Sequence, residues 1–166
     1  MEKVSFYRDE KIIKNAENAF KYHKNEISRR IPGADIQHVG STAVPGSVTK
    51  GDLDIQVRVD STRFDDAVEI LSEMYDLNTG SVSTSEFRAF EDREAYTPLG
   101  IQLTVIESEF DFFWKIRDIL LQNPDLKKEY NDLKLKYEGS DMEVYRNAKE
   151  KFFEKILQNS DRSPQY

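Results

Sequence analysis

The sequence predicts an α/β (α+β) domain: a mixed sheet flanked by helices and followed by a helical C-terminal segment. Apolar residues recur every three to four positions in residues 9–31 and 64–75, which is the spacing of one helix face. They alternate with polar residues in 53–59 and 101–105, as in half-buried strands. After residue 110 only helical spacing follows, so helices should make up the last third of the chain.

Composition indicates one soluble domain. The chain has 166 residues, 38% of them hydrophobic and 33% charged, and no linker or low-complexity tract divides it. We expect a single domain over residues 1–159. Residues 160–166 are polar and include a proline, so we expect a disordered tail there.

Charge and cysteine content exclude several classes of function. A net charge of −7 argues against bulk nucleic-acid or anionic-membrane binding, although a local basic pocket stays open. Cysteine is absent, which excludes a disulfide framework, a thiolate zinc site and thiol catalysis. No apolar stretch is long enough to span a membrane, so we expect a cytoplasmic protein. Its oligomeric state does not follow from the sequence.

The first half should form a helix and two strands. Helical spacing over 9–31 stops at Pro32-Gly33, and a short strand is expected over 34–39. A turn-rich loop with glycines at 40 and 46 comes next. From residue 52 the period is two, which places one set of alternate residues in the core and the other on a polar face.

The second half should contain a helix, two strands and three more helices. We expect a helix over 64–75, strands near 86–91 and 101–105, and a helix over 110–122 that is buried on most sides. Asn123-Pro124 should close that helix and open the next, and a final helix should follow Gly139-Ser140.

Two sequence features suit phosphate and metal chemistry. Asp52 and Asp54 are two positions apart, so a strand would place both carboxylates on one face, where they would hold Mg²⁺ or Mn²⁺. Gly40-Ser41, with Thr42, would form a small-residue turn whose N–H groups approach a phosphate. The alternative is a solvated polar face and an ordinary turn.

The order of these features resembles a known signature. Gly-Ser followed by Asp-x-Asp is similar to the pattern of the DNA polymerase β-like nucleotidyltransferase superfamily. The flanking residues resemble the GrpB family, which is usually described as nucleotidyltransferase-like and whose substrate is generally unassigned. The matching positions are His38 to Gly46, Lys50, Asp54-Ile55, Arg117-Asp118, Asn123-Pro124, Tyr130, Leu133-Lys134, Tyr145, Lys149 and Phe152.

The sequence departs from the family pattern in two places. Gly51-Asp52-Leu53 supplies the first acid of Asp-x-Asp, where many members have proline and two aliphatic residues. Gln102-Leu103-Thr104 replaces a His-x-His on the strand where the superfamily usually has its third metal carboxylate. Glu107 is acidic but has the parity of the apolar face. A two-metal mechanism is therefore weakened.

The remaining candidates each have a structural alternative. Lys50 would reach a phosphate or be solvated, and Arg88 would bind triphosphate or pair with a neighbouring acid. His38 is read as a satisfied buried histidine rather than a phosphate donor. Arg117, Lys134 and Lys149 match basic positions of the family, so they would either clamp an anionic ligand or be ordinary charges on a helix surface. Tyr145, one helical turn before Lys149, would stack on a base or, as is more usual for a helical tyrosine, belong to the core.

These features lead to a functional hypothesis with one rival. The leading expectation is a Mg²⁺-dependent enzyme that transfers a nucleotidyl group from a nucleoside triphosphate to a small-molecule acceptor. The rival is a module on the same scaffold that binds a nucleotide or phosphorylated metabolite without turnover. A purely structural domain would leave the Asp-x-Asp pattern unexplained.

Overall fold

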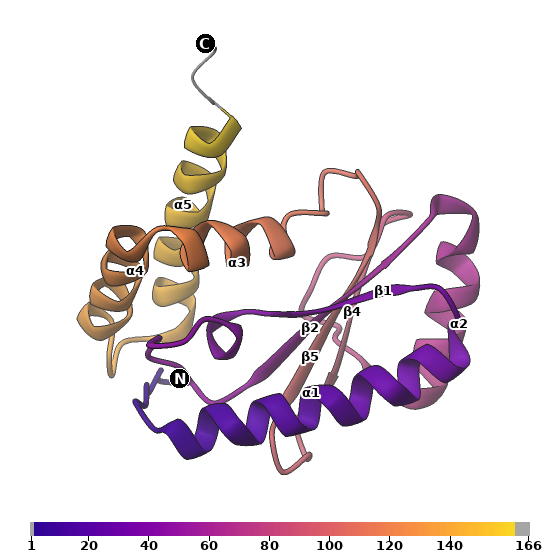
Figure 1. Cartoon of the computed structure of the whole chain (residues 1–166), viewed down its shortest axis with the longest axis horizontal. Helices are drawn as coiled ribbons and strands as arrows, with labels where there is room; N and C mark the ends of the chain where they lie inside the picture. The colour runs from indigo at the N-terminus through magenta and orange to yellow at the C-terminus, as the bar shows by residue number, and fades with distance from the viewer. Residues whose placement is uncertain (1, 162–166) are drawn as a thin grey trace.

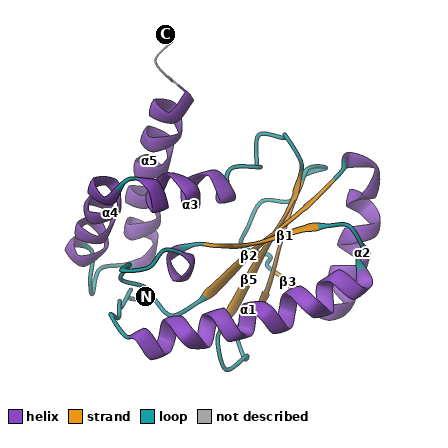
Figure 2. Ribbon diagram, in the orientation of Figure 1, coloured by secondary structure: helices purple, strands orange, loops and turns teal. Residues whose placement is uncertain are grey.

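The computed structural model describes residues 2–161, arranged as helices around a single sheet (Figures 1 and 2). The helices are α1 (Glu10–Arg30), α2 (Phe64–Met74), α3 (Phe113–Gln122), α4 (Pro124–Lys136) and α5 (Met142–Asp161). The strands are β1 (Asp35–Val39), β2 (Leu53–Val59), β3 (Asp76–Leu77), β4 (Phe87–Asp92) and β5 (Leu99–Val105). Of the expected tail, residues 160 and 161 end α5, and 162–166 lie outside the described residues.

The sheet is mixed, which confirms the predicted fold class. Its strand order is β1-β2-β5-β4-β3. β2 and β5 run parallel, and every other neighbouring pair is antiparallel. β2 and β5 are therefore interior strands, and their neighbours fix the direction of every side chain along them.

One face of the sheet packs against α1 and α2 and forms the main core (Figure 1). The alternation in β2 puts Leu53, Ile55 and Val57 into this core with no solvent exposure. Burying each such side chain contributes about 1.5–3 kcal/mol. Because this face of β2 is fixed by the core, the alternate residues that include Asp54 must point to the opposite face.

The C-terminal helices form a second, smaller core. Buried side chains of α3, α4 and α5 pack together with Val44 from the loop after β1. Figure 1 shows α3–α5 grouped at one end of the molecule and α2 at the other. In residues 2–161, no helix combines the length and apolar character needed to cross a membrane.

Helix α3 differs from the expectation for residues 110–122. It begins at Phe113, because residues 108–112 form a turn in which the N–H of Asp111 bonds the carbonyl of Ser108. Only Ile116 and Leu120 of the helix are buried, and Leu121 is 48% exposed. The helix is therefore not buried on most sides.

Helix α4 fastens the loop that leads to β2. The side chain of Asn131 accepts a hydrogen bond from the N–H of Val48 and donates one to the carbonyl of Gly46, both at 3.1 Å. Lys134 Nζ donates to the carbonyl of Val48 at 2.7 Å. Three hydrogen bonds thus hold residues 46–48, so the C-terminal helices position the chain just before the aspartates.

We expect Asn131→Ala to lower the free energy of unfolding by about 2–4 kcal/mol, because it leaves two backbone groups of the loop without their partner. Urea unfolding followed by circular dichroism measures the change. Asn147→Ala, at an exposed position of α5, is the matched control and should stay within about 0.5 kcal/mol of the native chain. Equal effects of the two substitutions would contradict this role of Asn131.

Candidate metal and phosphate site

The carboxylate of Asp54 lies over two glycines. Val39 pairs with Asp54 across β1 and β2, and Gly100 pairs with Asp54 across β2 and β5. A Cβ added to Gly40 would lie 2.3 Å from Asp54 Oδ2, and one added to Gly100 would lie 3.2 Å from Oδ1. Each carboxylate oxygen therefore occupies space that any other residue would fill. Gly40 has φ +76°, a second reason for glycine there.

In the turn after Gly40, two backbone N–H groups donate no hydrogen bond within the turn. A short 3-10 turn covers Ser41–Ala43. Its hydrogen bonds are donated by the N–H groups of Ala43 and Val44, so those of Ser41 and Thr42 take no part in it. Gly40 itself is exposed. A phosphate that approaches this turn would meet backbone N–H groups beside Asp54.

The hydroxyl groups of the turn are used to hold its shape. Thr42 is buried, and its hydroxyl donates to the carbonyl of Asp52 at 3.3 Å and lies 2.9 Å from His38 Nε2. Ser41 Oγ donates to Thr49 Oγ1 at 3.0 Å, and Thr49 Oγ1 also accepts from the N–H of Gly51. The side chain of Thr42 is therefore structural, and only its backbone is available to a ligand.

His38 is a satisfied histidine, as the sequence indicated. Its ring stacks on Phe20 with centroids 5.0 Å apart. Burial lowers the pKa of His38 to about 4, so the imidazole is neutral at physiological pH.

Asp52 lies just before β2 and, like Asp54, is partly exposed. Its side chain is 40% exposed, and Lys50 Nζ lies 3.6 Å from its Oδ2. The negative charge of Asp52 raises the pKa of Asp54, so the two acids interact electrostatically. The structure therefore brings Lys50, Asp52 and Asp54 together beside the Gly40 turn.

Desolvation makes ionisation of the Asp54 carboxyl group unfavourable. Desolvation raises its pKa from 3.8 to about 6, and the nearby charge of Asp52 raises it further, while Lys149 and Lys50 act in the opposite direction. A bound cation favours the ionised form of a poorly solvated carboxylate, because its positive charge stabilises the negative charge in place of water.

Lys149 of α5 interacts electrostatically with this acid. Burial lowers its pKa to about 8, and the positive charge of Lys50 lowers it too, whereas Asp54 and Asp52 raise it. Lys149 is half-buried and its Nζ lies 5.6 Å from the ring centroid of Tyr145. The C-terminal helices therefore add a lysine to the carboxylates, although more than 90 residues separate them in sequence.

Two other C-terminal candidates lie behind the site. Lys134 is 1% exposed, with its Nζ bonded to Val48 and 3.9 Å from the ring centroid of Tyr130. Burial lowers the pKa of Lys134 to about 6. Tyr145 is 2% exposed, and its ring packs edge-on against Phe6. Neither side chain has a free surface for a phosphate or a base, which favours their structural interpretation.

The two arginine candidates are engaged elsewhere. Arg117 Nη1 donates to Gln37 Oε1 at 2.7 Å and to the carbonyl of His38, and its Nε bonds Asp118. It ties α3 to β1. Arg88 lies on the core face of β4, 5.9 Å from the ring centroid of Phe64, so the sheet separates it from the aspartates. We correct its expected position: Arg88 does not line this site.

The polar face of β5 carries an amide near Asp54. Gln102 Nε2 would lie 3.6 Å from a Cβ on Gly100, the position that Asp54 Oδ1 also borders. Its Oε1 is buried without a hydrogen-bond partner. Thr104 is buried and accepts from Gln56 at 3.0 Å. Glu107 is exposed in the turn after β5, with φ +66°. In residues 2–161, no three His, Cys, Asp or Glu side chains form a metal-binding group.

An acid that the sequence did not single out fixes the other end of this face. Asp111 is buried and accepts hydrogen bonds from Arg58 Nε and Nη2, both at 2.7 Å, and from Gln56 Nε2 and Trp114 Nε1. Burial alone would raise its pKa, but the bonds from Arg58 and the N–H of Glu107 hold it below its ordinary value. An acid inside an apolar run was the available signal.

Comparison with known proteins decides the family. The family described as GrpB protein matches residues 12–159. The chain belongs to the GrpB family. It is 34% identical to a UPF0157 protein of Vibrio cholerae, over 93% of this chain and 82% of the relative. It is 36% identical to the glutamate-rich protein GrpB of Alkalihalophilus pseudofirmus, over 74% of this chain and 76% of the relative.

A solved GrpB structure has the same fold. The conserved protein GrpB from Enterococcus faecalis superposes with TM-score 0.71 at 17% identity, covering 94% of this chain and 98% of that one. The family resemblance drawn from residues 38–46 and the C-terminal helices is therefore confirmed. At 17% identity, the likeness to this solved structure establishes the fold alone. The candidate site is inferred from the residues of this chain described above.

We expect Gly40→Ala to cost about 2–4 kcal/mol of unfolding free energy, because its Cβ must displace the Asp54 carboxylate. Gly139→Ala is the control for the positive φ alone: Gly139 also has φ +76°, but a Cβ added there would meet no atom within 4 Å. It should cost only the backbone strain, about 1 kcal/mol. Thermal and urea unfolding measure both. Similar losses for the two variants would show that Gly40 is required for its backbone conformation alone.

We expect Asp54→Asn to raise the free energy of unfolding at pH 8 by about 1–3 kcal/mol. The folded-state pKa of about 6 lies above the ordinary 3.8, so ionisation destabilises the folded chain; the cost is complete above pH 6 and absent below pH 3.8. Urea unfolding at pH 8 and pH 3.5 measures this pH dependence. Asp60→Asn, exposed just beyond the other end of β2, is the control. A loss of stability in Asp54→Asn at pH 8 would contradict the burial argument.

Proposed function

We propose that the chain is a Mg²⁺-dependent nucleotidyltransferase that acts on a nucleoside triphosphate and a small-molecule acceptor. The observation that carries this proposal is the position of the Asp54 carboxylate, over the backbone of Gly40 and Gly100 and beside the turn Ser41–Ala43. Family membership fits it, because the GrpB resemblance of this sequence implies a nucleotidyltransferase-like domain.

The two aspartates fit a hard divalent cation. Mg²⁺ prefers carboxylate oxygens and is usually bound by one or two carboxylates together with substrate phosphates. Asp54 and Asp52 would supply these oxygens. The raised pKa of Asp54 favours such an ion, because a cation would offset the cost of burying this charge. When bound, Mg²⁺ or Mn²⁺ would neutralise part of the triphosphate charge.

The groups around the aspartates suit a polyphosphate. The N–H groups of Ser41 and Thr42 would bond its oxygens, as backbone donors do in other phosphate sites. Lys50 and Lys149 would add positive charge on the side of the carboxylates. The structural groups Lys134 and Tyr145 would keep the loop and α5 in place without touching the nucleotide.

In the proposed reaction, an oxygen of the acceptor forms a bond to the α-phosphorus. The bond from that phosphorus to the oxygen bridging the α- and β-phosphates breaks, pyrophosphate leaves, and the acceptor proton passes to water. The protein orients the triphosphate through the turn and its lysines. A net charge of −7 favours a small acceptor over a long nucleic acid.

A binding module without turnover is the second candidate, and a specific observation favours it. The polar face of β5 has the neutral Gln102 and Thr104, so Asp52 and Asp54 have no third acid beside them on this strand. Two-metal catalysis and a carboxylate base for the acceptor would then be missing.

We expect calorimetry to detect binding of a Mg²⁺-nucleoside triphosphate, and we expect Lys149→Met to weaken it by about tenfold or more, because one charge-assisted contact is lost. Lys151→Met, two residues further along α5 and exposed, should leave the affinity unchanged. Asp54→Asn should remove the dependence of binding on Mg²⁺.

Pyrophosphate release with candidate small-molecule alcohols and phosphates then separates the two candidates. Release that is lost in Asp54→Asn supports the transferase, and binding without release supports the module. Absence of binding for all four triphosphates with Mg²⁺ or Mn²⁺ would contradict both candidate functions.

A further inference from the structure

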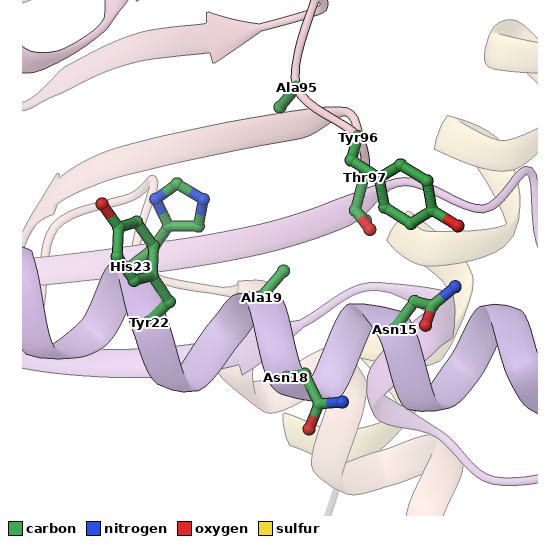
Figure 3. A pocket seen from close by; sticks show the side chains of 8 residues that line it. All are labelled: Asn15, Asn18, Ala19, Tyr22, His23, Ala95, Tyr96 and Thr97. Atoms are coloured by element: carbon green, nitrogen blue, oxygen red, sulfur yellow. The ribbon is translucent and has the colours of Figure 1, made fainter.

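A hollow of about 310 Å³ lies between α1 and the loop that joins β4 to β5 (Figure 3). One wall is a stripe of α1 residues at helical spacing, and the other is formed by residues 95–97. Figure 3 shows Tyr22 and Tyr96 at its two ends, with the short side chains of Ala19 and Ala95 between them. The lining residues are Asn15, Asn18, Ala19, Tyr22, His23, Ala95, Tyr96 and Thr97.

The two tyrosines of the hollow are largely exposed to solvent. Tyr22 is 63% exposed and Tyr96 is 89% exposed. The loop conformation that presents Tyr96 is fixed, because Asp92 Oδ1 accepts hydrogen bonds from the N–H groups of Glu94 and Ala95 at 3.2 and 3.1 Å. Such rings gain free energy when a flat partner covers them.

The polar groups of the hollow are neutral. Its lining includes the amides of Asn15 and Asn18 and the hydroxyl of Thr97, and it contains no Asp, Glu, Lys or Arg. His23 Nδ1 lies 2.8 Å from the hydroxyl of Tyr75. Burial lowers the pKa of His23, so its ring is uncharged at neutral pH. No described residue bonds its Nε2. The hollow thus offers donors and acceptors but no charge.

We propose that this hollow binds a planar, uncharged nitrogen heterocycle such as a nucleobase. The exposed tyrosine rings would cover the faces or edge of the ring, and the amides and imidazole would bond its polar edge. A phosphate is disfavoured here, because no cation lines the hollow. The proposal does not depend on the function of the Asp52–Asp54 site.

The hollow is nevertheless joined to the segment that carries the aspartates. The N–H of Leu53 donates to the carbonyl of Pro98, the residue after the loop wall, at 2.8 Å. A Cβ added to Gly51 would lie 3.5 Å from Ile12, which is one helical turn before Asn15 on α1. Residues next to each wall therefore lie against the chain on either side of Asp52.

The test uses adenosine and uridine, which have the ring but no phosphate, with ribose as the probe without a ring. In saturation-transfer NMR without divalent cation, we expect ring protons of a nucleoside to receive signal and ribose alone to receive none. We expect Tyr96→Ala and Tyr22→Ala to weaken binding at least fivefold, because each removes one stacking surface. Tyr7→Ala, at a tyrosine that is 50% exposed outside the hollow, is the matched control and should change nothing.

Other outcomes would overturn the proposal. These are no binding of either nucleoside at millimolar concentration, binding that survives both substitutions, and an equal loss in Tyr7→Ala. Loss of nucleoside binding in Asp54→Asn alone would place the ring at the aspartates instead. Because the probes lack phosphate and the experiment lacks Mg²⁺, a failure here leaves the proposed transferase site to its own test.

Discussion

The close contact between the Asp54 carboxylate and the backbones of Gly40 and Gly100 is the constraint on which the rest of the site depends. A strand side chain normally has side chains for neighbours on both adjacent strands. Here the partner on β5 is Gly100, and on the other side the carboxylate lies beside Gly40, the residue after the β1 partner Val39, so both carboxylate oxygens lie against glycine. The turn after Gly40 can approach the acid only because this space is empty of side chains, which brings backbone donors and a carboxylate to one place.

The C-terminal helices complete this arrangement through charge. Asp54 is destabilised by burial, and Lys149 from α5 partly compensates it. Desolvation lowers the pKa values of Lys149 and Lys134 as well, so the positive charges of this group are costly, as is the negative charge of Asp54. Such clusters are more usual at functional sites than in inert cores. Asn131 keeps the helices close enough for this coupling by bonding the loop before β2.

Much of the fold followed from local pattern, because one face of most elements is buried in a continuous core. The two-residue period of Leu53, Ile55 and Val57 determined which face Asp54 would occupy. The same reasoning failed for Arg88, because β4 carries phenylalanine on both faces, Phe87 on one and Phe90 on the other, and the alternation does not tell which face bears the site.

Long-range partners could not be predicted from the sequence. Asn131 and Asp111 are ordinary polar residues of the C-terminal third until the fold brings them to residues 46–48 and to Arg58. Gly100 carried a weak signal, since glycine within a strand often marks a close approach. Its partner Asp54 became evident only from the parallel pairing of β2 and β5, because more than 40 residues of sequence separate Asp54 from Gly100.

Gln102 connects the electrostatics of the site with its two candidate functions. Its buried Oε1 lacks a partner, and its amide borders the same position over Gly100 as Asp54 Oδ1. A buried acceptor without a donor is costly, and so is a desolvated carboxylate. A cation or a donor group on a ligand would relieve both costs at once. These two costs therefore support the proposed ligand at this position, whereas the proposed turnover would require in addition that the acceptor lose its proton without help from β5.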